Sequence, residues 1–223
     1  EMVLKSGDMQ RCLPELIWHL EDLRMGQSYP NFYASKLASK FVKVCLSGTG
    51  GDELFGGYPW RYYKAMRSES FDEYVENYYK YWQRLLPNKT LIKLFSPIWN
   101  EVKDVWTQEI FKNVLTDDNN HSPPKTPEEY INNSLYFEAR TFLHGLLVLE
   151  DKLSMAYGLE TRVPLLDNDL VDFSMKLPVR FKLDNIDKII KMDENELNKF
   201  LQRSKEGKAI LRKVFSNYVP YEI

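Results

Sequence analysis

The chain has 223 residues, of which 43% are hydrophobic and 28% charged, and its formal net charge is −2. This length fits one large domain or two small ones, and this composition is typical of a soluble globular protein. A net charge near zero supplies no overall positive field for nucleic acid, and no apolar run approaches the roughly 18–20 residues that span a bilayer. We therefore expect neither a nucleic-acid-binding protein nor a membrane protein.

The two cysteines, Cys12 and Cys45, are too few for a disulfide framework. Such thiols are typical of a reducing compartment, so we expect a cytoplasmic protein. Cys45 lies in an apolar run and is expected to be a small buried side chain. The histidines show no metal-ligand spacing with cysteines or acids; they are His19, His121 and His144.

The first predicted elements are two helices and a strand. Apolar residues at helical spacing predict a helix over Leu13–Leu20. After a turn-rich break at Gly26–Pro30, we expect a second helix over Phe32–Lys40. Phe41–Leu46 is short, β-branched and mostly apolar, which predicts a buried parallel strand flanked by helices.

The remainder of the chain is predicted to be almost entirely helical. Phe71–Leu85 carries aromatic and apolar residues three to four apart, which indicates a helix with a core-facing side rather than a platform for nucleobases. Further helices are expected over Leu91–Leu115 with a break near Pro97, from about Glu128, from near Asn168 and within Asp187–Phe215. Asp117–Pro127 is polar and contains prolines, which predicts a linker and a mobile loop.

A glycine-rich segment follows the predicted strand. It runs Ser47-Gly48-Thr49-Gly50-Gly51-Asp52-Glu53-Leu54-Phe55-Gly56-Gly57-Tyr58. Glycines let the backbone approach an anion closely, and a helix start supplies free N–H groups with partial positive charge. Ser47–Gly51 is therefore a candidate phosphate-binding turn, although it is not a Walker A loop because no Gly-Lys-Ser/Thr follows.

Two acids, Asp52 and Glu53, end this turn. Carboxylates beside a phosphate site suit a magnesium ion that lies between them and the phosphates. In the alternative interpretation Asp52 only caps the next helix, and the residues alone do not decide between the two.

Three segments resemble the asparagine synthetase C-terminal domain. Ser47–Tyr58 is similar to the family pattern Ser-Gly-acid-Gly-x-Asp-Glu-hydrophobic-Phe-Gly-Gly-Tyr. Glu150–Asp167 resembles the pattern Asp-Lys/Arg-x-Ser-Met-Ala followed by Glu-x-Arg-x-Pro-Phe-Leu-Asp, and Gly207–Lys213 resembles a weaker third element. Two specific segments in the family's order identify the chain as part of such a synthetase domain.

The resemblance implies an α/β fold of the ATP pyrophosphatase type, similar to the adenine nucleotide alpha hydrolases. Residues 1–66 would form part of its nucleotide-binding α/β region, and residues 67–223 would form a helical part. The family's enzymes use ATP and magnesium to adenylate a carboxylate, aspartate by default. Ammonia that an N-terminal glutaminase domain releases from glutamine then attacks, which gives asparagine, AMP and pyrophosphate. A homodimer is a possible assembly of this protein.

The resemblance also assigns roles within the loop. The residues that would contact ATP are Ser47, Gly48, Gly50 and Gly51. Asp52 would lie beside magnesium and pyrophosphate, and Glu53 would support Asp52 or hold the helix start. Thr49 completes the expected catalytic set, at a position where the family usually carries an acid.

Thr49 departs from the family pattern, because a hydroxyl cannot carry a negative charge near neutral pH. Losing one preorganised electrostatic group often costs about 10²–10³ in rate, so Thr49 puts ordinary asparagine synthesis in question. We expect Thr49→Glu to raise adenylate formation. Two other interpretations stay open: a catalytically degenerate scaffold that binds partners, and a plain helical interaction domain.

Two family segments do not occur in these 223 residues, namely Ser-Gly-Gly-x-Asp-Ser and Arg-x-Lys-x-x-Phe. We therefore expect this chain alone to be inactive. Asp151 and Lys152 are expected to form an ion pair at a helix end or to line a cleft. An internal set of ion pairs and caps is expected from Glu160, Arg162 and Asp167, with the first two on one face of an extended segment.

Overall fold

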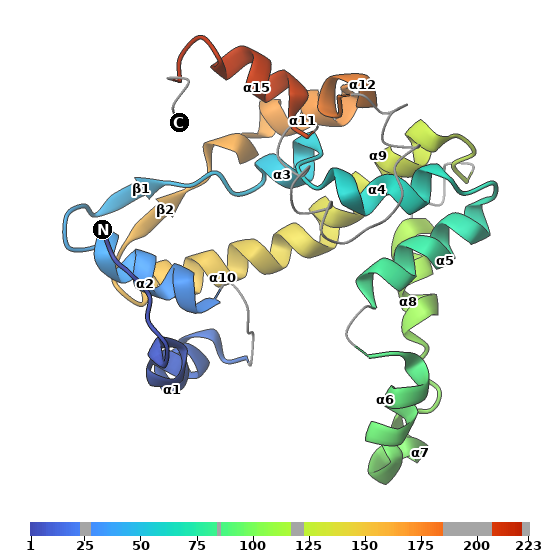
Figure 1. Ribbon diagram of the computed structural model, residues 1–223, viewed down its shortest axis with the longest axis horizontal. Helices are drawn as coiled ribbons and strands as arrows, with labels where there is room; N and C mark the ends of the chain where they lie inside the picture. Colours follow the sequence, from blue (N-terminus) through green and yellow to red (C-terminus); the bar gives the residue numbers. More distant parts are fainter. Residues whose placement is uncertain (23–27, 84–85, 117–122, 185–206, 220–223) are drawn as a thin grey trace. The chain divides into compact units, whose positions relative to one another are not determined.

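The computed structural model describes residues 1–22, 28–83, 86–116, 123–184 and 207–219 (Figure 1). The chain divides into two compact units, each built from two separate stretches of sequence. Unit 1 comprises residues 1–51 and 139–175, and unit 2 comprises residues 52–138 and 176–223. The boundary predicted at residue 66 does not coincide with a boundary between these units. The described part is mostly helical and has one short parallel sheet, which is compatible with part of an α/β fold.

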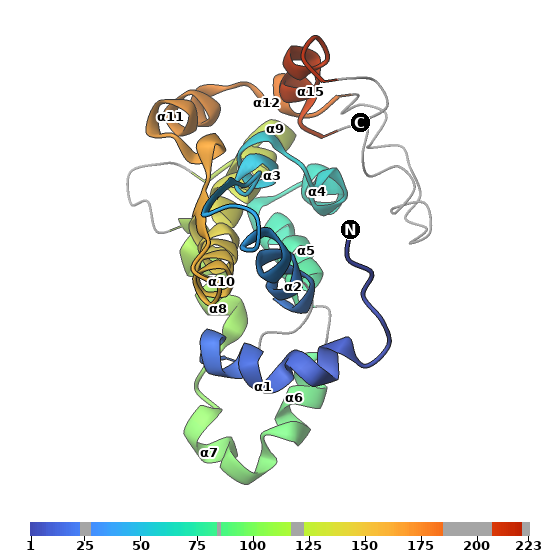
Figure 2. The ribbon, with the colours of Figure 1, turned by 90° about the vertical axis from the view of Figure 1, so that its left-hand side faces the viewer.

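Unit 1 packs three helices together and adds the sheet. Its elements are α1 (Asp8–Leu20), α2 (Ser28–Ala38), β1 (Val44–Leu46), α10 (Leu143–Met155), β2 (Glu160–Arg162) and the 3₁₀ turn η3 (Pro164–Leu166). The three helices contact one another, and α10 also contacts β2 (Figure 1 and Figure 2). Their shared core consists of Cys12, Leu16, Leu20, Phe32, Leu149 and Leu153.

Both predicted N-terminal helices are present, and both begin earlier than expected. α1 begins at Asp8 rather than Leu13, and α2 begins at Ser28. A carboxylate in the first turn interacts favourably with the helix dipole. The Asp8 carboxylate also accepts hydrogen bonds from the Lys5 N–H and the Arg11 guanidinium, which stabilises this start.

The predicted strand is shorter and more exposed than expected. Only Val44–Leu46 forms β1, and it pairs with β2 in the predicted parallel direction. The prediction that this strand is buried is wrong, because Leu46 is 75% exposed and Val44 is 39% exposed. Side chains alternate along a strand, so these two residues share one face, and that face is exposed in the described part of the chain. Cys45 is half-buried, with its Sγ 3.6 Å from Thr161 Oγ1.

Unit 2 is helical. Its elements are α4 (Pro59–Met66), α5 (Phe71–Trp82), α6 (Asn88–Leu94), η1 (Ser96–Ile98), α7 (Trp99–Val102), α8 (Thr107–Thr116), α9 (Pro127–Phe137), α12 (Val179–Lys182) and α15 (Ala209–Phe215). Three further elements cross the unit boundaries: α3 (Gly51–Phe55), the π-helical turn η2 (Glu138–Phe142) and α11 (Asn168–Lys176).

The expected aromatic face of α5 is confirmed. It contributes to a core of Tyr74, Val75, Tyr78, Tyr79, Phe111, Leu115, Tyr130 and Phe137. The rings of Tyr74 and Tyr130 stack with their centroids 4.7 Å apart. The aromatic side chains in this part of the chain therefore pack against one another in a core.

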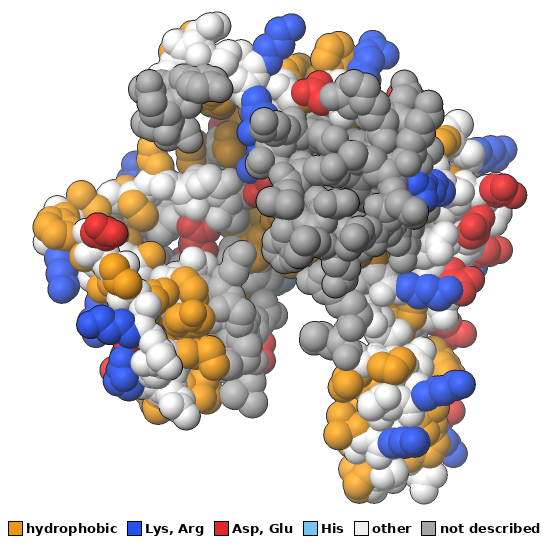
Figure 3. Space-filling model, viewed as in Figure 1, with side chains coloured by type: hydrophobic (Ala, Val, Ile, Leu, Met, Phe, Trp, Pro, Cys, Tyr) orange, Lys and Arg blue, Asp and Glu red, His pale blue; other side chains and the backbone are white. Residues whose placement is uncertain are grey.

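Helix breaks fall where the local chemistry changes. Pro97 lies in η1, which separates α6 from α7 and confirms the predicted break. Apolar side chains stay exposed over α6 and η1, including Leu94 and Ile98 (Figure 3). Of the predicted Asp117–Pro127 linker, residues 117–122 lie outside the described part of the chain, as do residues 187–206 of the predicted C-terminal helices.

The long helix predicted from about Glu128 is confirmed, with one π-helical turn inside it, because residues 127–155 are helical throughout. A capping box of Thr126 and Glu129 starts α9, and the π-helical turn η2 lies between α9 and α10. Glu138, the first residue of η2, is fully buried and accepts hydrogen bonds from two tyrosine hydroxyls. These bonds hold the chain at the point where the helical pattern changes.

The expected ion pairs are confirmed in part. Arg162 Nε lies 2.8 Å from Glu160 Oε1 on β2, and Asp167 Oδ1 accepts N–H groups at the start of α11. Lys152 pairs with Glu21 at 2.6 Å rather than with the expected Asp151. Among the helices that the structure describes, none is both long and apolar enough to cross a membrane.

Candidate functional site

The candidate loop begins where β1 ends, in unit 1. The Ser47 N–H donates to the Arg162 carbonyl at 2.8 Å, which extends the pairing of the strands by one residue. Beyond it, Gly48 is exposed, and a Cβ added there would meet no atom within 4 Å. The backbone at Gly48 is therefore open to a ligand.

Two glycines let the loop turn tightly against η3. Gly50 has a φ of 93°, a conformation that favours glycine, and a Cβ there would overlap Leu166. At Gly51 a Cβ would lie 2.7 Å from Leu165 Cδ1. These two glycines thus shape the turn, whereas Gly48 keeps it accessible.

Two hydroxyls of the loop are joined to an acid of α10. Ser47 Oγ and Thr49 Oγ1 are 3.0 Å apart, and the Thr49 N–H donates to Ser47 Oγ at 3.2 Å. The Thr49 hydroxyl also donates to Glu150 Oε2 at 2.5 Å. All three side chains are half-buried. The structure therefore places the Glu150 carboxylate next to Thr49, where the loop carries only a hydroxyl.

The second part of the loop belongs to unit 2, where Asp52 pairs with a lysine. Asp52 Oδ1 lies 2.8 Å from Lys208 Nζ, and each side chain is about a third exposed. Asp52 lies inside the first turn of α3 rather than at its N-cap, so capping does not explain this acid. A Cβ at Gly57 would overlap the Asp52 carboxylate, which means that glycine makes room for the acid.

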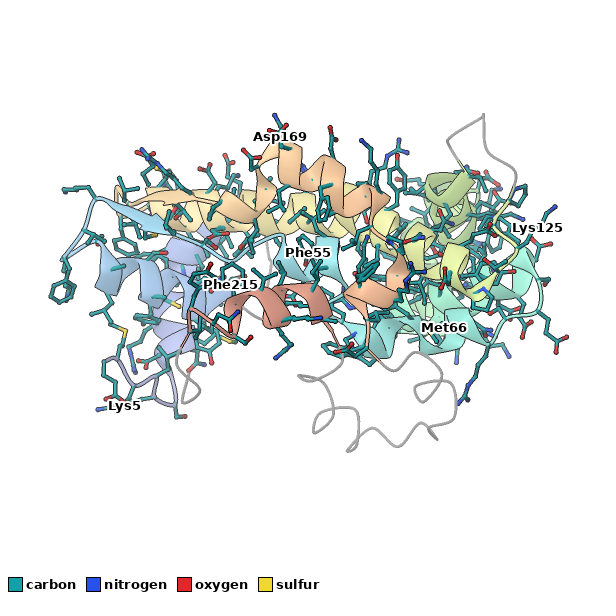
Figure 4. The ribbon with its side chains drawn as sticks, turned by 90° about the horizontal axis from the view of Figure 1, so that it is seen from above. Lys5, Phe55, Met66, Lys125, Asp169 and Phe215 are labelled. Atoms are coloured by element: carbon teal, nitrogen blue, oxygen red, sulfur yellow. The ribbon has the colours of Figure 1, made fainter. Side chains whose placement is uncertain are left out.

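Backbone contacts bring Lys208 to this position. The Lys208 N–H donates to the Phe55 carbonyl at 3.1 Å, which ties the start of α15 to the end of α3 (Figure 4). A Cβ at Gly207 would overlap the Gly56 carbonyl, so the two glycine-containing segments pack backbone to backbone. Lys208 itself has a φ of 57°, a left-handed conformation that costs about 1 kcal/mol for a non-glycine residue.

Glu53 is buried within unit 2. It is 1% exposed and accepts a hydrogen bond from the Tyr58 hydroxyl at 2.8 Å. Burial raises the pKa of the Glu53 carboxyl and also raises the pKa of Tyr58. The Arg61 guanidinium lies over the Tyr58 ring, 3.6 Å from its centroid. The buried Glu53 carboxyl therefore holds the end of the loop through its hydrogen bond with Tyr58.

The family model described as asparagine synthase matches residues 1–223. The chain belongs to the asparagine synthase family. Asparagine synthetase 1 (glutamine-hydrolyzing) of Bacillus subtilis strain 168 is 28% identical over 220 residues, which cover 82% of this chain and 32% of that relative. Asparagine synthetase 3 (glutamine-hydrolyzing) of the same strain is 27% identical over 191 residues, or 78% of this chain and 28% of the relative. No solved structure matches the chain.

This asparagine synthase family chain spans about a third of the length of the curated relatives that it matches. Within it, the structure brings Ser47 and Thr49 together, and it joins each half of the loop to a residue that the sequence had not assigned to a site. Those residues are Glu150 and Lys208. Both lie in segments that resemble the family, but neither local pattern shows which loop residue it contacts.

Proposed function

We propose that the chain is part of the synthetase domain of an ATP-dependent, amide-forming ligase that adenylates a carboxylate, aspartate by family default. Ammonia derived from glutamine would then give asparagine, with AMP and pyrophosphate as the other products. The observation that carries this proposal is the Ser47–Gly51 turn directly after β1, which is exposed at Gly48, in a chain that matches the asparagine synthase model throughout. The relatives named as asparagine synthetases support it.

The turn suits the ATP side of such a reaction. Adenylation needs positioning, charge neutralisation and exclusion of water rather than covalent help from the protein. Ser47 and Gly48 would contact ATP, because the Gly48 backbone is exposed. Gly50 and Gly51 would act by holding the turn against η3.

Asp52 fits a magnesium ligand. Magnesium prefers hard oxygen ligands and often binds through one or two carboxylates together with substrate phosphates. The Asp52 carboxylate is partly exposed, and Gly57 leaves it room. A bound magnesium ion would neutralise phosphate charge. Glu53 would support Asp52 by fixing the neighbouring Tyr58.

The other parts of the proposal follow from the family. The ammonia would come from a glutaminase domain, which agrees with the description of the relatives as glutamine-hydrolyzing. We propose the ATP pyrophosphatase-type fold for the complete domain, a cytoplasmic location and a homodimer as the first assembly to test.

Exchange of labelled pyrophosphate into ATP tests this function. The assay uses the full-length protein with magnesium, aspartate and a panel of other carboxylates. We expect exchange that depends on one carboxylate, and Asp52→Asn should lower it by about 10²–10³ because a preorganised charge is lost. Asp172→Asn, an exposed acid of α11, is the matched control and should exchange like the parent. No exchange with any carboxylate would favour a non-catalytic scaffold instead.

A further inference from the structure

The loop carries Thr49 in place of an acid, and Glu150 of α10 lies next to this residue. The Thr49 hydroxyl donates to Glu150 Oε2 at 2.5 Å, although the two residues are 101 positions apart in sequence. Both belong to unit 1. The donor is a hydroxyl and the acceptor is a carboxylate oxygen, and hydrogen bonds to a carboxylate are among the stronger ones.

The direction of the hydrogen bonds follows from counting protons. An ionised carboxylate only accepts, and a threonine hydroxyl has one proton to give. The Thr49 proton goes to Glu150, so the 3.0 Å contact between the hydroxyls must be a bond from Ser47 to Thr49. The Ser47 oxygen in turn accepts the Thr49 N–H. The order is therefore Ser47 hydroxyl to Thr49 hydroxyl to Glu150 carboxylate.

This order lets the charge of Glu150 act on the loop. Hydrogen bonds in series polarise one another, so a carboxylate at one end orients both hydroxyls and makes their oxygens more negative. The three side chains are half-buried, which keeps them near solvent and within reach of a ligand at the open Gly48 backbone. Residue 49 carries no negative charge, but Glu150 does, and its charge acts on the loop through the Thr49 hydroxyl.

We propose that Glu150 is the acid of this loop and acts through Thr49 as a positioning residue for adenylation. The inference rests on the proposed function. It also changes the expectation for Thr49→Glu: that variant alone sets two carboxylates against each other and should not raise adenylate formation. Only Thr49→Glu combined with Glu150→Gln moves the single charge onto the loop.

The test measures pyrophosphate exchange in full-length variants. We expect Glu150→Gln to lower the exchange rate about 10²–10³-fold, as for loss of one preorganised charge. Thr49→Val should lower it because the connecting hydroxyl is gone. The double variant Thr49→Glu/Glu150→Gln should recover most of the loss. Glu15→Gln, which removes the same charge from an exposed position of α1, should match the parent.

A binding measurement separates positioning from folding. Calorimetry with a non-hydrolysable ATP analogue should give Glu150→Gln the parent's affinity, and its denaturant midpoint should also match the parent. A Glu150→Gln protein that exchanges at the parent rate overturns the inference and leaves the proposed function intact. A folded, slow Glu150→Gln protein that the second substitution does not rescue also overturns it. A parent without exchange on any carboxylate removes the proposed function, and the inference with it.

Discussion

Glu138 and Glu150 both accept hydrogen bonds from hydroxyl groups, but their surroundings differ. Glu138, in unit 2, is fully buried and accepts from the hydroxyls of Tyr62 at 3.1 Å and Tyr78 at 2.9 Å. Glu150, in unit 1, is half-buried and accepts from Thr49 at 2.5 Å. Similar bonding therefore occurs once inside a core and once beside an open turn.

The electrostatics of the two sites differ accordingly. Burial raises the pKa of Glu138 to about 7, and the nearby Arg61 guanidinium, with its Nη1 3.3 Å from Glu138 Oε1, opposes this rise. A carboxylate that is inaccessible and surrounded by its own donors serves the fold. One that is reachable and bonded to a single loop hydroxyl remains available to act on a ligand. Burial, rather than residue type, separates the two roles.

The largest expected effect is on stability at Glu138. Glu138→Ala removes the carboxyl that accepts from the buried Tyr62 and Tyr78 hydroxyls and leaves a cavity, and such a large-to-small change in a core typically costs about 2–5 kcal/mol. Glu150→Gln should cost less than about 1 kcal/mol, as for other partly exposed groups. Urea unfolding of both variants measures the difference. Equal losses would mean that burial does not separate the two sites.

The pH dependence of stability should distinguish the same pair. The folded-state pKa of Glu138, about 7, lies above its ordinary value of 4.5, so the folded protein holds this proton more tightly. The resulting stabilisation is complete below pH 4.5 and is lost as the pH rises through 7, by up to about 3 kcal/mol. The free energy of unfolding, measured from pH 4.5 to above pH 7, should fall in this way for the unmodified protein and for Glu150→Gln. For Glu138→Gln this fall should be absent. A parent-like slope in Glu138→Gln would contradict the assignment.

Removing one hydroxyl from each site should give the smallest effects. Tyr78→Phe deletes a buried donor to a carboxylate and should cost about 1.5–3 kcal/mol when Glu138 is ionised. Thr49→Val keeps the side-chain shape and should cost less than about 1 kcal/mol, because water can reach the half-buried partner. Denaturant midpoints above pH 7 measure both. A larger loss for Thr49→Val would indicate that its bond to Glu150 supports the fold.

Local sequence patterns predicted the features that local chemistry decides. The break at Pro97 follows from the missing N–H of proline, and the start of α9 follows from the capping residues Thr126 and Glu129. The same holds for the shared face of Glu160 and Arg162 on an extended strand. The turn after β1 was also found from its glycines.

Features that depend on distant parts of the chain could not be predicted in this way. The contact from Thr49 to Glu150 and the ion pair from Asp52 to Lys208 each join segments more than a hundred residues apart. The exposure of Leu46 depends on what packs over that face of the sheet, which six residues do not reveal. Candidate site residues could therefore be proposed singly from the sequence, whereas their contacts with distant residues needed the fold.

The contrast between Gly48 and Gly57 has a practical use for engineering this loop. At Gly57 any side chain would occupy the space of the Asp52 carboxylate, so a randomised library should keep glycine there. Gly48 accepts a Cβ without contact, which makes Gly48→Cys a suitable attachment point for an environment-sensitive fluorophore. A dye at that position would turn the loop into an optical sensor of whatever small molecule approaches it.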